Sequence, residues 1–176
     1  MATKAKKYLD SYPPMKRKVP KGSVAIRGFF RLNITDPAGT IKGDSGWIEN
    51  QVCNDGIQIF LCHLLGASAA SQRPLYAALG TGTTPASNAT ALPGETQASK
   101  RATLSYTNSL SNTARFTGTF QSSDNWLAAA TTLQNIGLFG VSTSAAGSIF
   151  CGKTYATSAV ATNNNINFTY DVAFTT

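Results

Sequence analysis

The sequence predicts a mainly β protein: an antiparallel β-sandwich or jelly-roll-like barrel with one short helix and an extended basic N-terminal arm. Three observations predict this class. Charged residues make up only 13% of the chain, a composition that suits sheets whose solvent face carries hydroxyl and amide groups. Several segments alternate apolar and polar residues with the period of a strand. Helical periodicity is convincing at one place only, and basic residues concentrate near the N-terminus.

The length of 176 residues and the hydrophobic content of 42% are sufficient for one sizeable core. We expect two parts. Residues 1–22 form an extended basic arm, because they contain three prolines and no sustained apolar period. Residues 23–176 form a single β-sandwich domain.

The first strand of the domain is expected at residues 24–34, where the side chains alternate. A turn at residues 36–39 and a brief strand at 40–42 come after it. The face expected to be buried carries Val24, Ile26, Phe30, Leu32 and Ile34, and the other face carries Ala25, Arg27, Phe29, Arg31 and Asn33.

The second half of the chain continues the strand pattern. Residues 80–99 are rich in Gly, Thr, Ser, Ala and Pro and are expected to form a long loop, in which Gly80–Pro85 is a flexible connection. Two hairpins and a final strand are expected around them. The strand candidates are 75–79, the hairpin 101–107 with 114–120, the hairpin 133–141 with 148–155, and 166–174.

A helix is expected at residues 55–65, where apolar residues recur at three- and four-residue spacing. Asn54 or Asp55 can cap its first turn, and Gly66 can end it. Its apolar stripe, which should pack on a sheet, consists of Ile57, Phe60, Leu61, Leu64 and Leu65.

Charge is distributed unevenly along the chain. The first 31 residues hold nine basic side chains and one acid, or +8, whereas the other 145 hold six basic and seven acidic side chains, or −1. A cationic arm calls for an anionic partner or for solvent. The residues expected to attach the arm to such a partner are Lys4, Lys6, Lys7, Lys16, Arg17, Lys18 and Lys21.

No group of residues makes a defensible catalytic, cofactor or metal site in the sequence. His63 is the single histidine, and its neighbour Cys62 diverges from it on a helix. The segment Gly80–Pro85 lacks the Gly-Lys-Ser/Thr ending of a phosphate-binding loop. Cys53, Cys62 and Cys151 lack the spacing of a zinc site and are expected to be buried thiols. We therefore expect no cofactor and no enzymatic activity.

Aromatic residues on the predicted strands are expected in the core rather than on an RNA-binding face, because alternation places most of them there. Tryptophan leaves another possibility open. Trp126 comes after a loop signature at residues 122–125, so either it or Trp47 could be exposed and stack on a sugar, although packing in the core is the alternative.

One run of motifs resembles a diffuse group of small virion proteins of tailed bacteriophages, described as tail-fibre-like or minor structural proteins. The resemblance covers residues 46–174, and Ala78–Thr84 is its most specific part. Asn135 stands where the group has an acid, and the N-terminal arm is not part of the pattern. The matching segments are Gly46-Trp47, Asn50–Gly56 before the helix, Tyr76–Pro85, Thr90–Leu92, Arg101 at the start of a strand, and Asn135–Phe139.

The resemblance implies a role in assembly. We expect a virion structural protein, either a capsid-decorating, cement or head-fibre subunit or a tail component, whose arm binds neighbouring major capsid or tail proteins. Self-association into a symmetric homo-oligomer is expected. The alternatives are a jelly-roll coat protein whose arm binds the packaged genome, and a receptor- or glycan-binding module.

Localisation is part of the same expectation. The arm lacks the apolar region of a signal peptide, and no stretch of about 18 apolar residues could span a membrane. We therefore expect synthesis in the host cytoplasm, no membrane partner and a final place in the virion.

Overall fold

The computed structural model describes residues 21, 23–64, 73–96, 101–110, 112–143 and 147–175. Its strands belong to one 10-stranded sheet, and every strand pair is antiparallel. One short α-helix accompanies the sheet in the described part of the chain. The predicted mainly β, antiparallel class is therefore confirmed. Residues 1–20 and 22 of the predicted arm lie outside the described residues.

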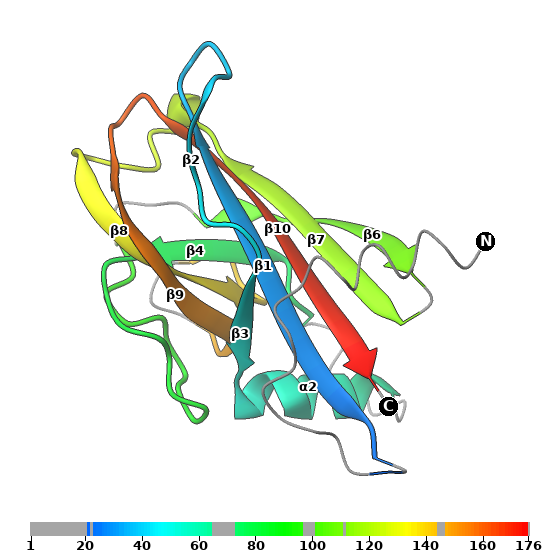
Figure 1. Cartoon of the computed structure of the whole chain (residues 1–176). Helices are drawn as coiled ribbons and strands as arrows, with labels where there is room; N and C mark the ends of the chain where they lie inside the picture. Colours follow the sequence, from blue (N-terminus) through cyan, green and yellow to red (C-terminus); the bar gives the residue numbers. More distant parts are fainter. Residues whose placement is uncertain are drawn as a thin grey trace.

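The sheet has the order β5-β4-β8-β9-β3-β1-β10-β7-β6, with β2 paired to β1 (Figure 1). The helix α2 lies at the end of the molecule where β1 starts (Figure 1). The elements are β1 (Ala25–Thr35), β2 (Ile41–Asp44), β3 (Ile48–Val52), α2 (Asn54–Leu64), β4 (Tyr76–Gly80), β5 (Ala102–Thr103), β6 (Ser105–Leu110), β7 (Thr113–Phe120), the 3-10 helix η1 (Ser122–Asp124), β8 (Thr131–Phe139), β9 (Ile149–Val160) and β10 (Asn165–Thr175).

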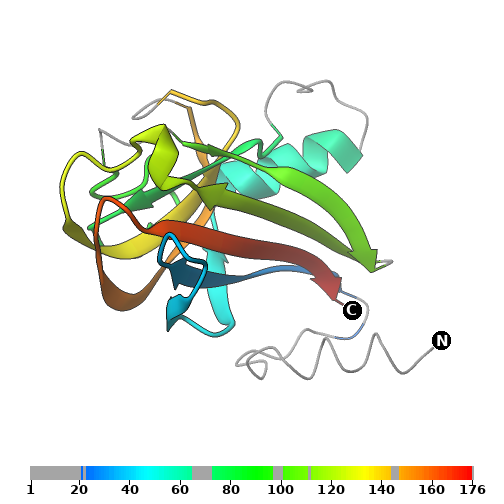
Figure 2. The same ribbon diagram turned by 90° about the horizontal axis from the view of Figure 1, so that it is seen from above.

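The sheet is nearly closed into a barrel, because two segments each connect its two halves. The first half of β3 pairs with β1, and its last two residues, Gln51 and Val52, pair with β9. Similarly, β5 pairs with β4, whereas β6 begins beyond Leu104 and pairs with β7. Strands that change sheets at a bend form the corners of such folds. Figure 2 shows the result from above: α2 lies on the opposite side from β1 and β10.

The core reflects the alternation of the long strands. Phe30 lies opposite Tyr170 in the β1–β10 ladder, and the two rings stack with centroids 5.8 Å apart. Both are 0% exposed. Val24, expected on the buried face, is 64% exposed because it precedes β1, and Ile26 and Phe174 are half-buried. Other inward residues of these two strands and of β7 are buried, as alternation predicts: Leu32, Ile34, Phe116, Phe120, Ile166, Phe168 and Val172.

Most expected elements are present. The helix and both hairpins form, and β1, β2, β4 and β10 lie within a residue or two of their expected bounds. The strand β3 is an addition to the expected elements, because Asn50 interrupts its apolar pattern. Gly28 of β1 lies opposite Asn50, and a Cβ at Gly28 would overlap the Asn50 amide. The missing side chain of Gly28 thus makes room for a polar group in this strand.

Helix α2 approaches β9 closely at its first turn. The amide of Cys53 donates to the carbonyl oxygen of Phe150 at 3.0 Å. A Cβ placed on Gly56 would overlap that same carbonyl oxygen. Ile59, one turn further on, is 8% exposed and belongs to the core. The distance between helix and sheet is therefore set by a glycine.

We predict that Gly56→Ala lowers the free energy of unfolding by about 1–3 kcal/mol, the usual cost of an overpacked contact. Chemical denaturation measures this change. Gly43→Ala is the matched control, because its Cβ would lie 3.6 Å from Ile34 Cδ1, an ordinary contact, and it should stay within about 0.5 kcal/mol of the parent. Equal stability of the two variants would contradict the close approach.

Candidate interaction surface

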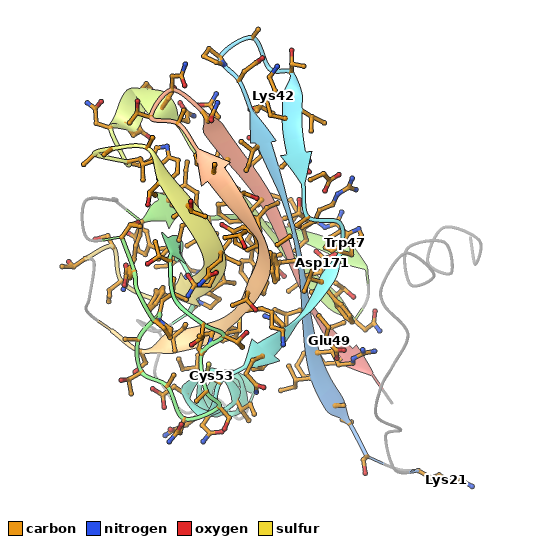
Figure 3. The ribbon with its side chains drawn as sticks, turned by 60° about the vertical axis from the view of Figure 1, so that its left-hand side comes forward. Lys21, Lys42, Trp47, Glu49, Cys53 and Asp171 are labelled. Atoms are coloured by element: carbon orange, nitrogen blue, oxygen red, sulfur yellow. The ribbon has the colours of Figure 1, made fainter. Side chains whose placement is uncertain are left out.

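The outer face of strands β3, β1, β10 and β7 carries a transverse row of charged and aromatic side chains. Strand register places Glu49 beside Phe29, Phe29 beside Asp171, and Asp171 beside Arg115. Direct cross-strand neighbours lie on the same face of a sheet, so these four residues form one row, the outer-face row. Trp47, Asp171 and Glu49 lie along the same side of β1 in Figure 3.

An arginine binds each carboxylate of the outer-face row. The Nε and Nη2 atoms of Arg115 donate to the two oxygens of Asp171 at 2.7 and 2.6 Å. The Nε and Nη2 atoms of Arg27 donate to Glu49 Oε1 at 2.9 and 2.8 Å. Asp171 is 0% exposed, and a buried carboxylate of this kind depends on its charged partner.

Aromatic rings lie beside both arginines. The guanidinium of Arg27 is 4.8 Å from the centre of the Phe29 ring, and that of Arg115 is 5.8 Å from the centre of the Trp47 ring. Alternation predicts an outward Phe29, yet its side chain is 2% exposed, in part because Arg27 lies over it. Trp47 is half-buried. Tryptophan and arginine are among the residues most enriched at binding hot spots.

Two further ion pairs lie toward the β1–β2 turn. Hydrogen bonding to Arg31 holds the pKa of Asp44 below its usual value, and the backbone N–H of Thr40 does the same for the pKa of Asp36. Lys42 Nζ lies 3.2 Å from Asp36 Oδ2. These exposed pairs fix the turn and leave its carboxylates ionised near neutral pH.

Of the residues predicted to attach the arm, the structure describes Lys21 alone. It is exposed, just before β1, and lies at the opposite end of that strand from Lys42 (Figure 3). Its charge therefore extends the series of charged groups along β1. The other predicted attachment residues lie outside the described part of the chain: Lys4, Lys6, Lys7, Lys16, Arg17 and Lys18.

The described thiols are unsuited to nucleophilic chemistry. Cys53 and Cys151 are free and 0% exposed. Burial raises the pKa of Cys53 to about 11 and that of Cys151 still further, so both remain protonated near pH 7. Cys62 and His63 lie in α2, and their side chains are outside the described part.

Hydrogen bonds hold the described part of the glycine-rich segment after β4, residues 81–96, which corrects the expectation that Gly80–Pro85 is a flexible connection. The amides of Thr81 and Gly82 donate to the carbonyl oxygens of Gly94 and Pro93 at 3.0 and 3.1 Å. The side-chain amide of Asn135, which is 0% exposed, donates to Thr83 O and Pro93 O at 3.1 and 2.8 Å. The backbone groups of this segment are therefore used in hydrogen bonds that fix the conformation of the loop.

Trp126 is packed in the core, so it presents no ring face for stacking on a sugar. Its side chain is 1% exposed and lies 5.3 Å from Phe120, measured between ring centres. The described residues also contain no group of three His, Cys, Asp or Glu side chains placed to hold a metal ion.

No protein-family model, curated protein or solved structure matches the chain. Among the described residues, no helix has the length and apolar character needed to cross a membrane. We therefore infer the function from the surface geometry and from the sequence motifs.

We predict that Arg115→Met lowers the free energy of unfolding by about 3 kcal/mol, because it leaves the buried carboxylate of Asp171 without its arginine. Arg31→Met is the matched control: the side chains of Arg31 and Asp44 are 44% and 31% exposed, and exposed pairs contribute less than about 1 kcal/mol. Urea denaturation of both variants tests the difference. Similar losses for the two would show that burial of Asp171 is unimportant.

We also predict that neither Cys53 nor Cys151 reacts rapidly with Ellman's reagent at about pH 8 in the folded protein, because their raised pKa values leave almost no thiolate. The measurement uses Cys62→Ser, so that these are the remaining cysteines. Unfolding in guanidinium should release both thiols at once. A fast-reacting thiol in the folded variant would contradict the prediction.

Proposed function

We propose that the protein is a structural component of a bacteriophage virion: a capsid-decorating, cement or head-fibre subunit or a tail component, held to neighbouring virion proteins through its N-terminal arm. In this proposal the β domain supplies a stable body, and the arm together with the adjacent outer face supplies attachment. The protein carries out no reaction.

The observation that carries the proposal is the way in which the resemblance motifs meet. Gly80 of β4 lies opposite Asn135 of β8, although the two motifs are far apart in sequence. The Asn135 amide binds the loop that contains Thr83 and Pro93. A Cβ at Gly80 would lie 2.5 Å from Asn135 Oδ1. The segments that carry the resemblance therefore contact one another in the fold, although Asn135 itself departs from the pattern of the group.

The charges and surface chemistry are consistent with attachment. Lys21 belongs to an arm with seven basic residues and one acidic residue, a net charge of +6 out of +7 for the chain, and it adjoins the strand that contains Arg27 and Phe29. An acidic capsid or tail surface would attract such an arm, and that attraction should weaken with salt. An extended arm of 22 residues can reach up to about 70 Å, enough to contact a neighbouring subunit.

We predict that mass spectrometry of purified particles of the encoding phage detects this protein in many copies, and that deletion of residues 1–22 abolishes its incorporation while the domain remains folded by circular dichroism. A charge-swapped arm with Glu at Lys16, Arg17, Lys18 and Lys21 is the control for length alone and should also fail to incorporate. Absence of the full-length protein from particles would overturn the proposal. Strong salt-sensitive binding of the arm to DNA would instead favour a genome-binding coat protein.

A further inference from the structure

A cavity of about 720 Å³ opens where β5 and β6 turn away from β7. Residues from β5, β6, β7 and β10 line it, together with the turn that contains η1. This volume falls within the range of roughly 300–1,000 Å³ that small-molecule sites occupy. The cavity lies at the closing corner of the barrel, and its lining residues Thr117 and Thr169 are two residues along β7 and β10 from Arg115 and Asp171 of the outer-face row.

Neutral hydrogen-bonding side chains make up most of the lining. The charged members are Asp124 and Arg101. Arg101 is already engaged, because its Nε and Nη2 atoms donate to the two oxygens of Glu95 at 2.8 and 2.9 Å. The hydroxyl and amide groups of the lining belong to Thr103, Ser105, Thr117, Thr119, Gln121, Asn167 and Thr169.

The backbone adds further polar groups at this corner. The β6–β7 ladder ends at Ser105 and Thr117, so the edge of β7 from Gly118 to Phe120 has no strand paired to it on the β6 side in the described sheet. A Cβ on Gly118 would lie 2.9 Å from the carbonyl oxygen of Thr103. Phe168 Cζ lies closer still, at 2.5 Å from that position, so Gly118 is tightly packed. The unpaired backbone groups of this edge are of the kind that bind donors and acceptors readily.

Two side chains retain unused donors. Thr119 Oγ1 donates to Asn167 Oδ1 at 2.8 Å, which orients the amide and leaves its N–H groups for another acceptor. Trp126 also lines the cavity, and its Nε1 has no hydrogen-bond partner among the described residues. This N–H is itself buried, so it lies behind the cavity surface, and the donors that a ligand can reach are those of Asn167.

We propose that this cavity binds an oligosaccharide. A sugar offers many neutral hydroxyl groups that both donate and accept, which matches a lining of hydroxyls, amides and edge backbone. A nucleic acid or another phosphate ligand fits poorly, because Glu95 already neutralises Arg101 and Asp124 would repel it. A peptide strand would find only Gly118 to Phe120 as an edge to pair with. The proposal does not rest on the virion role.

The test begins with a glycan array probed with the full chain, followed by titration of Trp47→Phe with array hits and with maltotriose and chitotriose. The chain has 2 tryptophans, so the emission of this variant reports Trp126 alone. We expect array binding and a saturable change in emission. Asn167→Ala in the same background should weaken binding about tenfold, the effect of one lost hydrogen bond. Thr119→Val should weaken it several-fold, because it releases the oriented amide.

Asn163→Ala is the matched control: Asn163 is exposed in the turn before β10 and does not line the cavity, so binding should be unchanged. Thermal unfolding confirms that each variant is folded. The proposal is overturned if the array and the titrations detect no saccharide, or if folded Asn167→Ala and Thr119→Val bind like the parent. Either result leaves the detection of the protein in particles unaffected, so failure here is separate from failure of the virion proposal.

Discussion

The pairing of β1 with β10 is the interaction on which the rest of the structure depends. It joins the first and the last strands of the described chain in a single unbroken register, from Ala25 opposite Thr175 to Thr35 opposite Asn165. That register determines both faces at once: Phe30 stacks on Tyr170 inside, and Phe29 lies beside Asp171 outside. Because the side-chain period of a strand is two residues, a slip of one residue would exchange these faces.

A buried polar group reinforces this register at some energetic cost. The Asn50 amide donates to the hydroxyl of Tyr170, so β3 is tied to β10 across β1. Gly28 provides the necessary space between them. Buried polar groups destabilise a core unless they are paired, and a displaced β3 would remove the Asn50 donor from the Tyr170 hydroxyl, leaving it only the thiol of Cys151. The arrangement therefore favours one register over its neighbours, which is consistent with the role that buried polar pairs have in specificity.

Much of the fold could be predicted from sequence because alternation and helical periodicity are local signals. Alternation places Arg27, Arg115 and Asp171 at outward positions, but their meeting could not be predicted, since it depends on which strands are neighbours. The order of β1, β10 and β7 is a long-range property. The same limit applies to the cavity beside Asn167, which exists because the β6–β7 ladder stops short of Gly118. Trp126 is a case in which the local signal misleads. Its polar flanking sequence suggests exposure, whereas the ring is packed against Phe120.

The neighbouring positions of Ala25 and Thr175 have a mechanical consequence. Tension transmitted through the N-terminal arm reaches the barrel at Ala25 and Thr175, the last residue pair of the β1–β10 ladder, next to the end of the C-terminal strand. When force pulls the paired strand ends apart, the hydrogen-bonded pairs break one after another, because the force acts on only one pair at a time. When force acts along the axis of β1, it is distributed over all the hydrogen-bonded pairs of the ladder at once. The direction in which the N-terminal arm leaves the barrel therefore determines how much force the β domain withstands before it unfolds.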